Sequence, residues 1–142
     1  MKKTTQELLN LMNNTKNYHE YYNANQEDIS SGHMKIDRAL NALLIDKGLK
    51  KSEVIARSGL ENHYAYQILS GTKVPTRDKV IMLCIGMGLS VEEFQRLLKI
   101  TGYAQLYSKN ERDNVILYGV TKKLSIIDIN DILYEMGYEL LK

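Results

Sequence analysis

Residues 50–77 constrain the fold of this chain most, because two short helical patterns with a glycine between them fall inside this stretch. Val54 and Ile55 mark the apolar side of the first pattern, which we expect to form a helix over residues 51–57. Glycine adopts the left-handed conformation that ends a helix without a steric penalty. We therefore expect the first helix to end at Gly59 and a tight turn to follow it.

The second helix, expected over residues 62–70, is amphipathic. Ala65, Ile68 and Leu69 recur at the spacing of one helix face, which we expect to pack on the first helix. The opposite face is polar, and an α-helix fits the major groove of B-DNA. Amide side chains pair bidentately with adenine, and a tyrosine reaches a thymine methyl group or a phosphate. The stretch predicts a helix-turn-helix unit whose base-reading residues are Asn62, His63, Tyr66 and Gln67.

Basic and hydroxyl side chains surround this helix pair, and we expect them to contact the DNA backbone. A loop containing Pro75, the only proline of the chain, follows the second helix. Thr76 is placed to cap the next helix, whose free N–H groups suit a phosphate. The predicted phosphate-binding residues are Lys51, Ser52, Ser70, Lys73, Thr76 and Arg77.

Positive charge is concentrated on the same part of the chain. Residues 47–79 carry seven basic and three acidic side chains, although the formal net charge of the whole chain is only +2. A local excess of this kind is typical of a phosphate-binding surface. A solvated helical face with no ligand is the alternative explanation.

The spacing of glycines, apolar residues and proline resembles that of the Cro and C1 repressor (XRE-type) regulators. The resemblance covers about residues 34–94 and is carried by Gly48-Leu49, Ser58-Gly59-Leu60, Leu69-Ser70-Gly71, Lys73 and Pro75. It implies an all-α, lambda-repressor-like helix-turn-helix bundle, here with added N-terminal and C-terminal helices. It also implies a sequence-specific transcriptional regulator of double-stranded DNA that binds as a two-fold dimer.

Three residues depart from the usual pattern of that family. Ile55 stands where a small alanine is usual, and Ala65 stands where a β-branched residue usually faces it. We interpret this as a size exchange that keeps the packed volume about constant, which protein cores tolerate well. Lys51 replaces a frequent glutamine and keeps a phosphate contact as a point charge.

At 142 residues the chain is long enough for one domain with an appendage. We expect an N-terminal helical appendage and linker over 1–33, the helix-turn-helix domain over 34–101, and a C-terminal helical extension over 102–142. Thr4 and Glu7 have the spacing of a capping box. The tyrosines that follow, at 18, 21 and 22, either pack sideways on a neighbouring helix or form a stacking platform for bases.

The C-terminal part has its own helical signals. Ser90 with Glu93, and Ser125 with Asp128, have capping-box spacing. We expect Leu106 and Tyr107 of the intervening loop to dock on the core. The last helix, over 125–136, has a wide apolar face that either covers the core or meets a second subunit, formed by Ile126, Ile129, Ile132, Leu133 and Met136.

Several functional classes have no support in the sequence. Cys84 is the only cysteine, which suits a buried, inert thiol, and the three histidines show no metal-ligand spacing. The acidic residues of the last helix (Asp128, Asp131 and Glu135) lack a partner base or nucleophile, so we expect neither an enzyme nor a cofactor. No apolar run is long enough to cross a membrane and no signal peptide is visible, so we expect a cytoplasmic protein.

A second functional class stays open, because a helix-turn-helix scaffold does not guarantee its usual ligand. Glu61, at the tip of the expected reading helix, repels phosphate and favours a protein-interaction adaptor or an antitoxin-like partner. The partners expected from the sequence are double-stranded DNA, a second copy of the chain, and a protein bound through the C-terminal helices.

Overall fold

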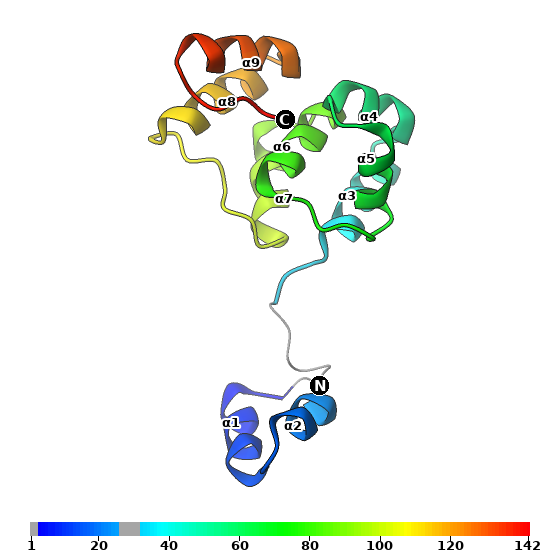
Figure 1. The fold of residues 1–142 in the computed structure, drawn as a ribbon, viewed down its shortest axis with the longest axis vertical. Coiled ribbons are helices and arrows are strands. Elements are labelled where there is room, and N and C mark those ends of the chain that lie inside the picture. Colours follow the sequence, from blue (N-terminus) through cyan, green and yellow to red (C-terminus); the bar gives the residue numbers. More distant parts are fainter. Residues whose placement is uncertain (1–2, 26–31) are drawn as a thin grey trace. The chain divides into compact units, whose positions relative to one another are not determined.

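The computed structural model describes residues 3–25 and 32–142, and every regular element in these ranges is an α-helix (Figure 1). The chain is therefore all-α, as the sequence predicts. It divides into two compact units, residues 1–33 and 34–142. The first contains α1 (Thr5–Asn14) and α2 (Tyr18–Asn25). The second contains α3 (Ile36–Asp46), α4 (Lys51–Ser58), α5 (Asn62–Leu69), α6 (Arg77–Met87), α7 (Val91–Ile100), α8 (Glu111–Thr121) and α9 (Ile126–Glu135).

The first unit begins at the predicted cap, where the Thr4 hydroxyl accepts the Glu7 N–H at 3.1 Å. The tyrosine-rich segment, for which we expected no particular element, forms α2. The rings of Tyr18 and Tyr21 lie 6.1 Å apart in a tilted contact. The side chain of Tyr22 and most of the polar run after it lie outside the described residues.

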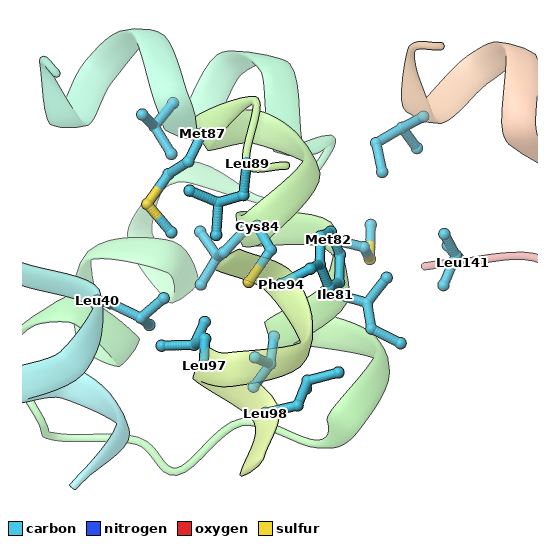
Figure 2. Packing of buried hydrophobic residues seen from close by; sticks show 14 of the residues in the cluster. Leu40, Ile81, Met82, Cys84, Met87, Leu89, Phe94, Leu97, Leu98 and Leu141 are labelled. Atoms are coloured by element: carbon cyan, nitrogen blue, oxygen red, sulfur yellow. The ribbon is translucent and has the colours of Figure 1, made fainter. Parts of the chain in front are cut away.

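Helix α6 is the centre of the second unit. Its side chains are buried around almost the whole circumference, and the buried ones are Val80, Ile81, Met82, Leu83, Cys84 and Met87. Figure 2 shows side chains of α3, of α7 and of the last residues converging on α6, with Leu40, Leu97, Leu98 and Leu141 among them. Burial raises the pKa of the Cys84 thiol, so this thiol stays protonated and inert.

Helices α4 and α6 cross so closely that their backbones touch. A Cβ atom added to Gly86 would lie 2.5 Å from the backbone oxygen of Val54 and 3.1 Å from the backbone nitrogen of Ser58. Only a glycine fits such an approach. Gly86 therefore fixes the distance from α4 to the core helix.

Helices α8 and α9 lie side by side and complete the same hydrophobic core (Figure 1). Gly119 of α8 leaves space for Ile129 of α9, whose side chain a Cβ atom at position 119 would overlap. Ile126, Ile129 and Leu133 are buried, so the wide face of α9 covers the core. Met136 is an exception, because it follows the last turn of α9 and is 57% exposed.

The loop between α7 and α8 docks through one of its two predicted anchors. Leu106 is buried, and the Gln95 side chain accepts its N–H and donates to its carbonyl oxygen at 2.8 and 2.7 Å. The expectation for Tyr107 was wrong, since its side chain is 59% exposed. The Tyr107 backbone is held instead, through its N–H, by the carboxylate of Asp113.

Candidate nucleic-acid interface

The turn between α4 and α5 is held rigidly at its first residues. Gly59 has a φ of 76°, the left-handed conformation that its type allows. The buried Ser58 hydroxyl donates to the Ile55 carbonyl at 2.7 Å and accepts the Leu60 N–H at 3.2 Å. Helix α5 therefore leaves α4 at a fixed angle.

The start of α5 is capped by a carboxylate. Glu61 accepts the backbone N–H groups of Tyr64 at 2.7 Å and of His63 at 2.9 Å. These two bonds hold the pKa of Glu61 below its ordinary value, and His63 adds to the effect. A full negative charge consequently stands at the tip of α5 at neutral pH.

The end of α5 is fixed by a residue that the sequence pattern did not indicate. The Asn41 amide on α3 donates to the Leu69 carbonyl at 2.8 Å and to the Asp37 carbonyl at 2.7 Å. A helix end carries unpaired carbonyl groups, and a side-chain donor from another helix satisfies one of them here. Helix α3 thus provides a partner for a carbonyl group at the end of α5.

The two faces of α5 divide as its periodicity predicts. Ala65, Ile68 and Leu69 are buried against the core. On the opposite side Asn62, His63 and Tyr66 are exposed and Gln67 is half-buried. The structure therefore brings the four predicted base-reading side chains to one outer face of a helix that is fixed at both ends.

The loop after α5 is folded back on the helix end. The Gln67 carbonyl accepts the N–H groups of Thr72 at 2.9 Å and Lys73 at 3.1 Å. The Ser70 hydroxyl, one of the predicted phosphate ligands, lies within hydrogen-bonding distance of the Thr72 hydroxyl at 2.9 Å. Val74 is 81% exposed beside Lys73, a feature that the sequence did not reveal.

Two helix N-termini lie next to the predicted phosphate ligands. Lys51 and Ser52 are exposed on the first turn of α4, where no described side chain caps the backbone at Lys50. Thr76 occupies the N-cap position of α6, but its hydroxyl accepts no bond from the first turn, so the predicted side-chain cap is wrong. Uncapped N–H groups at a helix start suit an anion.

The structure gives Arg77 a different role from the one predicted, and it leaves the phosphate-binding set. Its guanidinium donates to both carboxylate oxygens of Asp113, at 3.1 and 2.9 Å. It also donates to the carbonyl groups of Ala104 at 2.8 Å and Gln105 at 3.0 Å. Arg77 thus ties α6 to α8, and a phosphate would have to displace these internal acceptors.

A second ion pair lies beside the first. Arg112 of α8 donates to both carboxylate oxygens of Asp78, at 3.0 and 2.8 Å. Two neighbouring residues of α6, one basic and one acidic, therefore pair with two neighbouring residues of α8, one acidic and one basic. We call the two pairs, Arg77 with Asp113 and Asp78 with Arg112, the α6–α8 clasp.

Other candidate sites have little support in the described residues. No group of three or more histidine, cysteine or acidic side chains there could hold a metal ion. Within the same part of the chain, no helix combines the length and apolar character needed to span a membrane. Asp128, Asp131 and Glu135 are all exposed on α9.

Comparisons with known proteins give no further guidance. Neither models of protein families, nor curated proteins, nor solved structures gave a match to this chain.

Proposed function

We propose that α4, the turn and α5 form a helix-turn-helix of the lambda-repressor-like (Cro/C1) type, and that the protein is a sequence-specific regulator of double-stranded DNA. The observation that carries the proposal is the outer face of α5, where Asn62, His63, Tyr66 and Gln67 project from a helix fixed at both ends. A fixed helix loses little conformational entropy when it enters the major groove. Specific base contacts then form at a small cost in conformational entropy.

Phosphate contacts position such a helix in the groove, and the surroundings of α5 offer the groups they require. Lys51 and Ser52 stand at the uncapped start of α4, and Lys73 projects from the loop after α5. Thr76 adds a hydroxyl and the uncapped start of α6. Two helix starts and two lysines flanking one exposed polar helix form a coherent surface for a DNA backbone.

Selection of bound sequences from a randomised duplex pool tests this proposal. The intact chain should enrich a motif, two-fold symmetric if the protein binds as a dimer. Gln67→Ala should lose preference at one base pair of each half-site, because a bidentate amide contact is worth about 1–3 kcal/mol. Specific and random duplexes should be compared by fluorescence anisotropy at several salt concentrations.

Two lysine variants test the phosphate contacts, one at the proposed surface and one, the matched control, away from it. Lys51→Ala should weaken binding to specific and random duplexes alike and lower the salt dependence by about one phosphate contact. Lys109→Ala, in the exposed loop before α8, should leave both unchanged. Equal losses on specific and random DNA for Gln67→Ala would remove this residue from base reading. The absence of any enriched motif would contradict the proposal.

The charge of Glu61 gives an independent prediction. Glu61→Asn keeps a side-chain oxygen at the N-cap of α5 but removes the negative charge. Affinity for every duplex should rise, and the ratio of specific to random binding should fall or stay constant, because the lost repulsion acts on phosphates. Titration of the specific and the random duplex with the natural protein and with Glu61→Asn measures this effect. Unchanged affinity for random DNA would show that the Glu61 carboxylate does not face the backbone.

One observation favours a protein-interaction adaptor as the second candidate function. Ile127 and Tyr134, seven residues apart on the outer side of α9, are 74% and 77% exposed. Residues at this spacing share a helix face, so α9 presents apolar side chains away from the core. This surface suits a protein partner and is compatible with DNA binding by α5.

A further inference from the structure

A cavity lies where the C-terminal ends of α4 and α6 meet the start of α9. Its volume is about 470 Å³, within the range of sites that hold small organic molecules. Most of the lining is apolar and is formed by Ile85, Leu89, Phe94, Val120, Leu124 and Ile126. A ligand in this cavity would therefore bury an apolar body.

Two cations line the same cavity, and none of the described residues that line it is acidic. The Arg57 Nε donates to the Gly86 carbonyl at 2.8 Å. The Lys123 ammonium lies 3.0 Å from the Gly88 carbonyl and 3.3 Å from the Leu89 carbonyl. A guanidinium has five N–H donors and an ammonium has three, so both retain donors for an anion.

Lys123 ends α8 in the left-handed conformation common just after a helix, where its N–H donates to the Val120 carbonyl and the Leu124 N–H donates to the Gly119 carbonyl. The φ of Lys123 is 58°, the left-handed region that residues with a side chain rarely adopt. Among the described residues it is the one non-glycine residue with a positive φ. The end of α8 requires this conformation, which a glycine adopts at the end of α6. Here it accompanies a lysine side chain that reaches the cavity.

We propose that this cavity binds an amphipathic organic anion, with its apolar body among the aliphatic side chains and its carboxylate at Arg57 and Lys123. Charge complementarity selects this occupant, because a carboxylate forms charge-assisted hydrogen bonds with the spare donors of both cations and an uncharged apolar molecule does not. The site is separate from the outer face of α5. Its occupation does not depend on the proposed DNA binding, and the two can fail independently.

Titration of the full chain with straight-chain carboxylates tests the proposal. Octanoate, decanoate and dodecanoate, each below its micellar concentration, should raise the melting temperature in order of length, because a ligand of the folded state stabilises it. Decanol should act more weakly than decanoate. Isothermal titration calorimetry with decanoate then gives the affinity directly.

Two variants assign the binding to the cavity. Ala56 lines the cavity from an exposed position of α4, so Ala56→Phe should fill the space and abolish decanoate binding. Ala42→Phe, at an exposed position of α3 away from the cavity lining, should bind decanoate normally. Lys123→Gln should weaken decanoate binding about tenfold and leave decanol unchanged, since a charge-assisted hydrogen bond is lost. Its neighbour Lys122 is exposed and does not line the cavity, and Lys122→Gln should have no effect.

Three results would overturn the proposal. The first is the absence of a response to any carboxylate. The second is decanoate binding that survives both Ala56→Phe and Lys123→Gln. The third is equal affinity for decanoate and decanol, which would show that the cations do not recognise the head group. Calorimetry with Lys123→Gln stays informative even where Ala56→Phe fails to fold.

Discussion

Gly86→Ala should destabilise the protein, although alanine is the better helix former. In an exposed helix this substitution stabilises by about 1 kcal/mol. Here the added Cβ would lie 2.5 Å from the Val54 carbonyl oxygen, so α4 and α6 must separate. Overpacking of a core typically costs about 1–3 kcal/mol, and we expect the upper part of that range because the obstacle is backbone. Urea unfolding followed by circular dichroism measures the loss.

Gly119 supplies the matched control for this prediction. A Cβ atom at position 119 would overlap the side chain of Ile129 and no backbone atom. A substitution of Ile129 by a smaller residue would remove this overlap. Gly119→Ala should therefore destabilise the natural sequence. Introduced into the Ile129→Ala variant, the same substitution should leave the stability of that variant unchanged or raise it. Gly86→Ala should cost the same in both backgrounds. Equal stability of Gly86→Ala and the natural sequence would contradict the close approach of α4 to α6.

Helix positions and helix faces were predictable because they depend on residues near each other in the chain. The residues between 51 and 70 set both helices of the α4–α5 pair through apolar spacing and a single glycine. The capping box at Ser90 and Glu93 is present with both of its hydrogen bonds. Local hydrogen bonds of this kind need no knowledge of the tertiary fold.

Contacts between distant residues were not predictable from the same patterns. Arg77 looked like a phosphate ligand because it follows the reading helix, but its partner Asp113 lies thirty-six residues later in the chain. Gly86 and Gly119 have no side chain because atoms of a neighbouring helix, α4 for Gly86 and α9 for Gly119, occupy the space where a Cβ atom would lie. Asn41 caps α5 from a helix that precedes it by two elements. In each case the cause is a neighbour in space that periodicity does not reveal.

Several local predictions also failed, and they share a physical cause. Thr76 and Met136 lie at helix ends and Tyr107 lies in the loop between α7 and α8, so tertiary packing decides whether each side chain turns inward. Thr76 occupies the N-cap position without a side-chain hydrogen bond, and the side chains of Tyr107 and Met136 are exposed. Ends of elements are less constrained by periodicity than their interiors.

Asp113→Asn should break the Arg77–Asp113 pair of the α6–α8 clasp. The Asp113 side chain is nearly buried and accepts two bonds from Arg77 and one from the Tyr107 N–H. An amide in its place directs two donors at a guanidinium that has no acceptor. Breaking a buried ion pair costs about 3–5 kcal/mol, and partial exposure of Arg77 lowers our expectation to about 2–3 kcal/mol. Urea unfolding at neutral pH gives the value.

The pH dependence of stability distinguishes this role from simple loss of packing. Burial opposes ionisation of Asp113, but the bonds from Arg77 and the Tyr107 N–H outweigh it and hold its pKa below the ordinary 3.8. A lowered pKa in the folded state contributes stability above the unfolded value, and this contribution disappears as the pH falls through the folded value. The natural sequence should therefore lose stability below about pH 4 more steeply than Asp113→Asn. Asp131→Asn, an exposed carboxylate on α9, should keep the natural slope.

Parallel profiles for Asp113→Asn and the natural sequence would mean that the Asp113 charge contributes nothing to stability. The substitution would then act only through shape. A steeper natural profile, together with an unchanged slope for Asp131→Asn, would instead identify Arg77 as a structural cation of the clasp. That result matters for the DNA-binding proposal, because it leaves Lys51 and Lys73 as the cations of the phosphate set.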